Sequence, residues 1–323
     1  MALRMTENHT ELSFRYMRIE GRKEKLLDFL LRKFRYLDRE EWLENIREKR
    51  LTVDGRNADP FQLLKDHQKI LYLRPDFLEP EVDSSFDKIF EDDFLVAFNK
   101  PGNLPTSPSG KYYKNTLVNL AKKKYGWKKL FTLHRLDRET SGVILFAKQK
   151  KTAQKMAEMF REQQTRKFYK AILENSLPAD DVIVSMPIGS DPKSSIRIKQ
   201  GVQFEGRPCT THFNLLKNLD KRCLVGIRPM TGRTHQIRVH AHYIGCPVTG
   251  DKLYGLADDG FLNWLEEGQS YLDQLNFPVS RQLLHAMEIK FTHPESNEAL
   301  TIHADDSKML QICLLYTSDA ADE

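Results

Sequence analysis

Hydrophobic residues recur at helical spacing in the first third of the chain and predict a small helical and strand-containing unit there. The apolar positions of residues 26–34 return every three or four residues, as on one face of a helix. A second helix is expected after Asp38, a suitable N-cap with Glu41 three residues further on. Short strands are expected at 51–53, which leads into an Asp-Gly turn, and at 70–73.

From residue 94 onward the pattern predicts buried strands separated by helices. Residues 94–98 form an apolar run typical of a buried strand, and residues 167–173 alternate like a strand. The remaining expected elements are helices over 116–125 (ended by Gly126), 152–163 and 234–244, and strands near 210–215 and 223–227. This mixture of elements indicates an α+β protein.

Composition narrows the class of protein without identifying it. Hydrophobic residues make up 40% of the 323 residues and charged residues 29%, which is ordinary for a globular protein. No apolar run approaches the roughly 20 residues that span a bilayer, and the polar N-terminus lacks the apolar centre of a signal peptide. We therefore expect a cytoplasmic protein without membrane contact. Four scattered cysteines lack metal-ligand spacing and are expected to be free thiols: Cys209, Cys223, Cys246 and Cys313.

Charge is unevenly distributed, although the net charge is only +5. Residues 111–170 hold 17 Lys and Arg against 4 Asp and Glu, a difference of +13, whereas residues 251–323 hold 4 against 14, a difference of −10. A concentrated basic block is typical of a protein that binds a polyanion such as RNA. A solvated helix face rich in lysine would have the same composition, so both interpretations stay open.

Residues 133–148 are the most informative segment. A short polar loop carries one carboxylate, Asp137, between basic residues and leads directly into an apolar strand. The loop matches the His-Arg-Leu-Asp-x-x-Thr-Ser-Gly signature at every defined position, and it resembles the RluA-type pseudouridine synthases, which isomerise uridine within RNA. In that family the Asp is the nucleophile, so the resemblance implies this role for Asp137.

Three further segments resemble the same family. Residues 99–102 look like its opening motif, residues 232–240 like its third motif and residues 281–286 like its late Arg-Gln-x-Leu-His-Ala segment. The resemblance covers residues 94–303. It implies a catalytic domain built on a mixed, largely antiparallel sheet with flanking helices, and a reaction that needs no cofactor and no metal.

The second arginine of the third motif, Arg238, is the residue that the resemblance implies as the partner of Asp137. A carboxylate nucleophile must stay ionised where water is largely excluded, and a neighbouring cation lowers its pKa. On the expected helix, Arg238 shares a face with His235 and His242. Without the resemblance, a surface helix with a basic stripe would be the preferred interpretation.

Tyr169 lies in a segment similar to the family's Lys-x-Tyr-x-Ala strand, in which the Tyr sits against the target base. Proton removal and ring stacking both remain open for it. Arg135 would share a side with Asp137 in an extended segment, where it could occupy the space that a flipped uridine leaves, or form a salt bridge with Glu139. The remaining candidate RNA contacts are basic residues: His134, Arg138, Arg233, His235, Lys122, Lys123 and Lys124.

Other kinds of site are less consistent with the sequence. His134 to Asp137 superficially resembles a kinase catalytic loop, but no Gly-rich loop accompanies it. Ser141 could serve a Ser/His/Asp hydrolase, yet no GxSxG elbow is present, and His235, His240 and His242 lack the HExxH pattern of a zinc site. The serious alternative is a non-catalytic RNA-binding protein on the same fold.

The domain organisation follows from these segments. A lead-in (1–12) precedes a module (13–76) that resembles the RNA-binding domain of ribosomal protein S-four type; a linker (77–86) joins it to the catalytic domain (87–312). Residues 313–323 look like the in-frame translation of a sequencing adapter and are expected to be a non-native tail. We expect a monomer that acts on structured RNA, with large-subunit ribosomal RNA favoured over transfer RNA.

Overall fold

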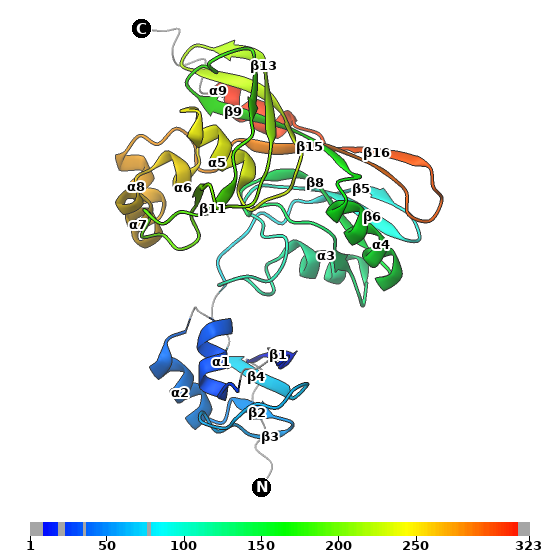
Figure 1. Cartoon of the computed structure of the whole chain (residues 1–323), viewed down its shortest axis with the longest axis vertical. Coiled ribbons are helices and arrows are strands. Elements are labelled where there is room, and N and C mark those ends of the chain that lie inside the picture. Colours follow the sequence, from blue (N-terminus) through cyan, green and yellow to red (C-terminus); the bar gives the residue numbers. More distant parts are fainter. Residues whose placement is uncertain (1–8, 19–22, 35–36, 76–78, 316–323) are drawn as a thin grey trace. The chain divides into compact units, whose positions relative to one another are not determined.

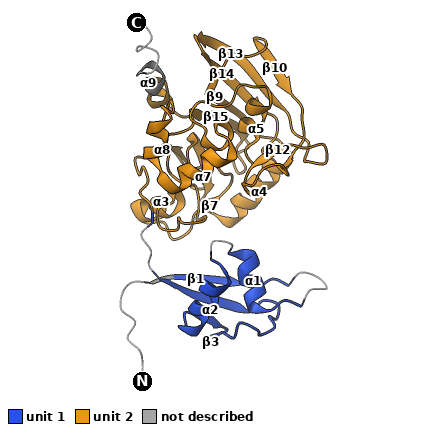
Figure 2. Ribbon diagram, turned by 90° about the vertical axis from the view of Figure 1, so that its left-hand side faces the viewer, with its two compact units in different colours: residues 1–79 blue, residues 80–323 orange. Residues whose placement is uncertain are grey.

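The computed structural model describes residues 9–18, 23–34, 37–75 and 79–315, which form two compact units (Figure 1). Unit 1 comprises residues 1–79 and unit 2 residues 80–323 (Figure 2). In the described part of the chain, no helix is long and apolar enough to cross a bilayer.

Unit 1 is a four-stranded antiparallel sheet accompanied by two helices. The strands lie in the order β1-β4-β2-β3, so the first strand pairs with the last. The elements are β1 (His9–Arg15), α1 (Leu26–Lys33), α2 (Arg39–Arg47), β2 (Leu51–Val53), β3 (Arg56–Asn57) and β4 (Lys69–Pro75).

The helices and strands predicted for this unit are confirmed, with one exception. Asp38 and Glu41 form the expected reciprocal cap of α2, because the Asp38 carboxylate accepts from the Glu41 N–H at 2.9 Å and the Glu41 carboxylate from the Asp38 N–H at 2.6 Å. Trp42 and Tyr72 are buried in the core between helices and sheet. Residues 9–12, expected in a polar lead-in, instead belong to β1, where backbone pairing with β4 compensates for their weak apolar pattern.

Unit 2 is built on one large mixed sheet with the strand order β10-β13-β14-β9-β15-β8-β6-β5, in which β16 pairs with β15 and β7 with β8. Among the described strands of this sheet, only the pair β8–β15 is parallel, so the predicted α+β fold with a largely antiparallel sheet is confirmed. Its strands are β5 (Asp87–Glu91), β6 (Leu95–Lys100), β7 (Phe131–Thr132), β8 (Ser141–Ala147), β9 (Arg166–Glu174), β10 (Asp181–Val184), β13 (Thr211–Leu219), β14 (Arg222–Pro229), β15 (Leu284–Thr292) and β16 (Ala299–His303).

Helices and one small hairpin complete unit 2. The hairpin consists of β11 (Ile188–Ser190) and β12 (Gln200–Val202). The helices are α3 (Leu117–Tyr125), α4 (Lys150–Arg161), α5 (Gln236–Tyr243), α6 (Lys252–Gly255), α7 (Asp258–Glu267), α8 (Gln269–Gln274) and α9 (Ser307–Leu315). Gly126 ends α3 in the left-handed conformation, as predicted. Of the predicted non-native tail, residues 316–323 lie outside the described residues.

The centre of the sheet determines where the polar loop of residues 133–140 lies. The whole of β8, which follows that loop, is buried. Gly142 in β8 lies opposite Ala286 in β15, and Ala286 lies opposite Tyr169 in β9. A Cβ on Gly142, which has φ +110°, would come within 2.1 Å of the Ala286 carbonyl oxygen. This close approach requires glycine and brings the loop beside Tyr169.

Candidate active site

A buried lysine, Lys100, is hydrogen-bonded to the loop that carries Asp137. The ammonium of Lys100 is fully buried and donates to the carbonyls of Pro101 (2.8 Å), Leu104 (2.8 Å) and Arg138 (3.0 Å). Burial lowers the pKa of Lys100 to about 7, although the charge of Asp137 opposes this shift. The three hydrogen bonds tie the segment after β6 to the residue next to Asp137.

Asp137 and Arg238 meet across 101 residues of sequence. Nη1 of Arg238 donates to Oδ2 of Asp137 at 2.7 Å. The other edge of the same guanidinium binds Asp251, with Nε donating to Oδ2 at 2.6 Å and Nη2 to Oδ1 at 2.7 Å. The Arg238 side chain is 9% exposed and that of Asp251 0%, whereas the Asp137 side chain is 37% exposed. The arginine is thus immobilised from behind, and Asp137 alone of the three is open to a substrate.

The electrostatics of this triad keep Asp137 ionised. Burial would raise the pKa of Asp137, but the positive charge and hydrogen bond of Arg238 outweigh it and hold that pKa below its usual value. Burial likewise opposes the charge of Arg238, yet Asp251 and then Asp137 raise its pKa, so it remains a cation. The result is an accessible carboxylate with a permanent counter-ion.

Two tyrosine side chains, those of Tyr254 and Tyr169, lie near the Asp137–Arg238 pair. The Tyr254 ring lies 4.9 Å from the Arg238 guanidinium, and its hydroxyl lies 2.9 Å from Nδ1 of His235. Tyr169 is buried on β9; burial, together with the charge of Asp137, raises the pKa of its hydroxyl. Tyr169 is therefore a neutral phenol close to the carboxylate.

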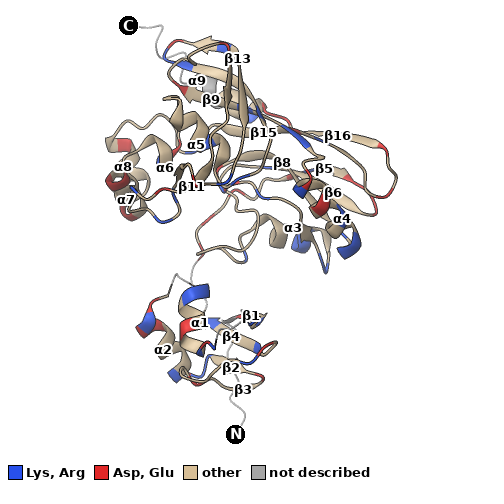
Figure 3. Ribbon diagram, in the orientation of Figure 1, with Lys and Arg blue, Asp and Glu red and all other residues tan. Residues whose placement is uncertain are grey.

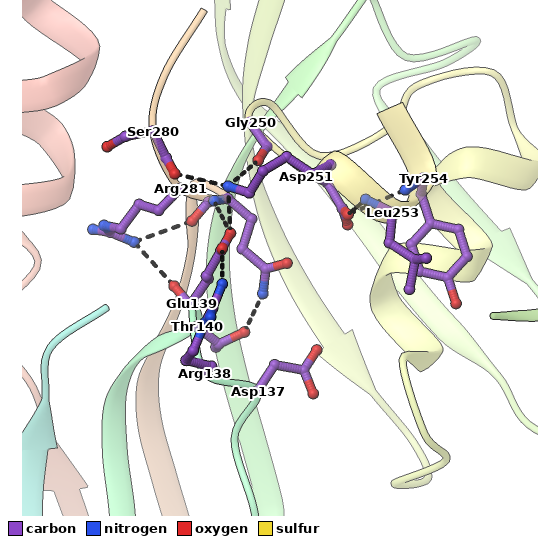
Figure 4. A network of polar contacts seen from close by, with 12 residues as sticks. Asp137, Arg138, Glu139, Thr140, Gly250, Asp251, Leu253, Tyr254, Ser280 and Arg281 are labelled. Carbon is purple, nitrogen blue, oxygen red and sulfur yellow. Dashed lines mark hydrogen bonds and ion pairs between the residues drawn. The ribbon is translucent and has the colours of Figure 1, made fainter. Parts of the chain in front are cut away.

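A polar network next to Asp137 was not anticipated from the sequence (Figure 4). Oε2 of Glu139 lies 2.8 Å from Nζ of the buried Lys252, which also donates to the Ser280 carbonyl at 2.7 Å. Thr140 accepts from the side-chain amide of Gln282 at 2.5 Å. These contacts connect the Asp137 loop to the segment after α8 and to the first residue of α6.

Asp251 is the most important residue that the sequence reasoning missed. Besides holding Arg238, its carboxylate accepts from the N–H groups of Leu253 (3.0 Å) and Tyr254 (3.2 Å) and so caps α6. In the sequence, the signal for Asp251 as a helix N-cap was its position after Gly250 and before the short segment that contains Leu253 and Tyr254. A Cβ on that glycine, Gly250, would come within 2.2 Å of the Arg281 carbonyl oxygen.

The predicted helix around Arg238 is confirmed, but it is not a surface helix. It begins at Gln236, two residues later than expected, after His235 adopts a left-handed φ of +56°. All residues from Gln236 to Ala241 are buried. Because α5 is covered on both faces from Gln236 to Ala241, Arg238 is not part of an exposed basic stripe, and that interpretation is wrong.

Two of the predicted RNA contacts have internal partners instead. His134 accepts from the Leu145 N–H at 3.1 Å, and burial lowers the pKa of His134 to about 3, so it is a neutral structural imidazole. Arg138 donates to the Tyr112 hydroxyl at 3.0 Å and to Glu139 at 2.9 Å. These geometries contradict a direct phosphate contact by His134 and leave Arg138 engaged in positioning the loop.

The other basic candidates lie nearer to solvent. Arg135 is exposed, and the alternative salt bridge to Glu139 is not formed, because Glu139 binds Arg138 and Lys252. Arg233 is half-buried, with Nε 3.4 Å from the Pro208 carbonyl. The last turn of α3 carries the predicted lysines Lys122, Lys123 and Lys124, whereas acidic residues gather on α7 and α8 (Figure 3).

The residues of the competing sites do not converge. Ser141 is buried and lies 2.8 Å from Nδ1 of His285, within the sheet. His240 lies between Thr211 and the Met186 carbonyl, and His242 is exposed. Among the described residues, no group of three or more His, Cys, Asp or Glu side chains is arranged to hold a metal ion.

The mixed, largely antiparallel sheet of unit 2 and its helices have the fold of the pseudouridine synthases. The solved structure of Human RNA Pseudouridylate Synthase Domain Containing 1 has the same fold, with a TM-score of 0.56 and 24% identity over 71% of this chain and 86% of that chain. Residues 94–243 match the family model for RNA pseudouridylate synthase.

Two curated relatives are similar to this chain over about two thirds of its length or more. The chain is 30% identical to an uncharacterized RNA pseudouridine synthase of Synechocystis over 71% of this chain and 79% of the relative. It is 34% identical to ribosomal large subunit pseudouridine synthase C of Vibrio cholerae over 67% of this chain and 64% of the relative. The chain belongs to the RNA pseudouridylate synthase family, and its activity is the isomerisation of uridine in RNA.

Proposed function

We propose that Asp137 is the nucleophile of this isomerisation. The reaction breaks the glycosidic bond of a uridine and forms a carbon–carbon bond between the same ribose and uracil. A carboxylate can attack either the ribose anomeric carbon or the uracil ring. The observation that carries the proposal is that Asp137, ionised by Arg238, is accessible while its counter-ion is buried.

The assignment of Asp137 is tested by removing its charge. Asp137→Asn and Asp137→Ala are expected to abolish pseudouridine formation in RNA from cells that lack the wild-type gene. Asp180→Asn, a substitution of an exposed carboxylate elsewhere in unit 2, serves as the matched control. Wild-type rates in Asp137→Asn would mean that another group is the nucleophile; a wild-type protein that binds RNA but converts no uridine would favour a non-catalytic binder.

Tyr169 and Arg135 complete the proposed reaction centre. Tyr169 faces the target base, where its neutral hydroxyl relays a proton and its ring packs against uracil. Arg135, exposed two residues before Asp137, fills the space that the flipped uridine leaves in the RNA. Arg135→Ala is expected to weaken binding of paired RNA more than binding of a single strand.

For the RNA target, we infer large-subunit ribosomal RNA rather than transfer RNA. The name of the Vibrio cholerae relative supports this choice. A second support is the module at residues 13–76, which we propose to be an RNA-binding domain of ribosomal protein S-four type. We propose that residues 77–86 join this module to a catalytic domain at residues 87–312. Mapping pseudouridines in ribosomal and transfer RNA with and without the gene tests it. A change confined to transfer RNA would contradict the ribosomal target.

We further infer a monomer in the cytoplasm. The three described cysteines, Cys209, Cys223 and Cys246, are buried free thiols, as expected in a reducing compartment. Light scattering of the purified protein measures the state of association, and a stable dimer would contradict the inference.

A further inference from the structure

The small hairpin of unit 2 presents a phenylalanine to solvent. After β12 the chain turns at residues 203–206, where the Gly206 N–H donates to the Gln203 carbonyl at 2.8 Å. Ile188 and Arg207 then exchange backbone hydrogen bonds of 3.0 and 2.8 Å. A Cβ on Gly206 would come within 2.5 Å of the Ile188 carbonyl carbon, so the turn is tightly closed. Phe204 lies at the tip of this closed turn.

Phe204 is 91% exposed, the highest value for any large hydrophobic side chain in the described parts of the chain. An aromatic ring that contacts no core contributes nothing to folding through burial, and solvent exposure of a ring is unfavourable. Rings of this kind are used in recognition, since a flat apolar face accepts a nucleobase or another aromatic group.

The charge of the segment that carries Phe204 favours a polyanion over an apolar protein surface. Residues 188–208 carry four basic residues and two acidic ones. Arg207, which is exposed, lies directly after the turn that carries Phe204, and the exposed Lys193 and Arg197 lie in the loop that joins the two strands of the hairpin. A basic surface that also presents an aromatic ring is the usual composition of a site for single-stranded RNA.

The hairpin is also continuous with the proposed active site. The backbone N–H of Gln200 donates to the Tyr254 hydroxyl at 3.1 Å, and the Tyr254 ring lies over Arg238. On the other side of the turn, the Pro208 carbonyl lies 3.4 Å from Nε of Arg233, just before α5. The hairpin region is therefore hydrogen-bonded to two residues that lie beside the proposed active site, Tyr254 and Arg233.

We propose that Phe204 is a stacking platform for an unpaired RNA base that flanks the target uridine. The proposal rests on the RNA substrate of the proposed function and adds a contact outside the reaction centre. Its partner is single-stranded RNA, because the bases of a duplex already stack on one another and do not present a face.

Binding of a fluorescent twelve-nucleotide uridine strand to the full-length protein tests this contact. Phe204→Ala is expected to raise the dissociation constant about tenfold, as loss of one stacked base does. Phe204→Trp should keep or increase affinity, whereas Phe204→Leu, which keeps an apolar group without a ring face, should resemble Phe204→Ala. The same variants should bind a twelve-base-pair RNA duplex like the wild type.

The matched control is Ile183→Ala, which removes another exposed hydrophobic side chain, from the edge strand β10. Its affinity for the uridine strand should equal that of the wild type. Equal affinity of Phe204→Ala and wild type would overturn the proposal, and so would full affinity of Phe204→Leu. Because the readout is binding, this result is separate from failure of the proposed function, which is read from pseudouridine formation.

Discussion

Arg238 donates a 2.7 Å hydrogen bond to Asp137 while its opposite edge is clamped by a second carboxylate, Asp251. A buried arginine shared by two carboxylates cannot leave the site without exposing an unpaired charge. The proposed nucleophile, Asp137, therefore has a counter-ion that is part of the protein interior.

Removing the guanidinium should impair catalysis more than binding. We expect Arg238→Met to lower kcat by at least about a hundredfold, because Asp137 loses the charge that keeps it ionised in a partly dry site. The acid limb of the pH–rate profile should move to higher pH, since the pKa of Asp137 is held down by Arg238. Steady-state kinetics from pH 4 to 8 measures both effects. An unchanged acid limb would show that Arg238 does not control the ionisation of Asp137.

Replacing Asp251 separates its two roles, which are the ion pair with Arg238 and the N-cap of α6. In Asp251→Asn the side-chain oxygen can still accept from Leu253 and Tyr254 and cap α6, but the charge that faces Arg238 is lost. We expect a folded protein with a reduced kcat and a nearly unchanged KM for RNA. Circular dichroism checks the fold, and a wild-type kcat would mean that packing alone positions Arg238.

The hydroxyl of Tyr169 should matter for the chemical step. We expect Tyr169→Phe to lower kcat by about 10² or more, the usual cost of losing a positioned proton-transfer group, while RNA affinity is retained because the ring remains. Single-turnover rates and equilibrium binding distinguish the two. If Tyr169→Phe reacts at the wild-type rate and Tyr169→Leu does not, the ring acts by packing alone.

Acid should destabilise the folded protein. Burial lowers the pKa of His285 to about 4 from the ordinary histidine value of about 6.5, so the unfolded state binds more protons between these values. The free energy of unfolding should fall by roughly 3 kcal/mol as pH drops from 6.5 to 4 on account of this residue. Urea unfolding at several pH values measures the slope. His285→Asn, which can still bond to Ser141, should reduce that slope.

The glycine of the signature should be irreplaceable for steric reasons. Gly142→Ala places a methyl group against the Ala286 backbone at a φ of +110°. We expect a loss of stability on the order of 3 kcal/mol. Gly110→Ala is the control, because Gly110 also has positive φ but no atom within 4 Å of the added Cβ. Thermal unfolding that is equal in the two variants would contradict the steric argument.

The lysines at the end of α3 should contribute charge to RNA binding. Reversing Lys122, Lys123 and Lys124 to Glu should lower affinity and reduce the slope of log affinity against log salt by about 2, since each phosphate contact releases counterions. Lys221→Glu, at an exposed turn, is the single-charge control. An unchanged slope would identify the α3 lysines as a solvated helix end.

Much of the fold was readable from local patterns. The apolar period of residues 26–34, the Asp38–Glu41 cap and the apolar run in β6 each correspond to an element, because neighbouring residues alone determine them. The prediction failed at β1 and did not anticipate β10 or β16. A strand at a sheet edge is stabilised by pairing with a distant segment, and its own sequence carries little signal.

The sequence by itself determined the family motifs, the candidacy of Asp137, Tyr169 and Arg238, and the mixed α+β class. Only the tertiary structure determined which charged side chains form ion pairs and which are buried. Arg238 lies on the buried part of α5, His134 is a neutral imidazole that accepts from the Leu145 N–H, and Asp251 joins the site from the start of α6, which no motif identified. Spacing along the chain shows which side chains share a face. The Asp137–Arg238 contact joins residues 101 positions apart in the sequence, and the burial of α5 requires segments from other parts of the chain, so both exist only once the chain has folded.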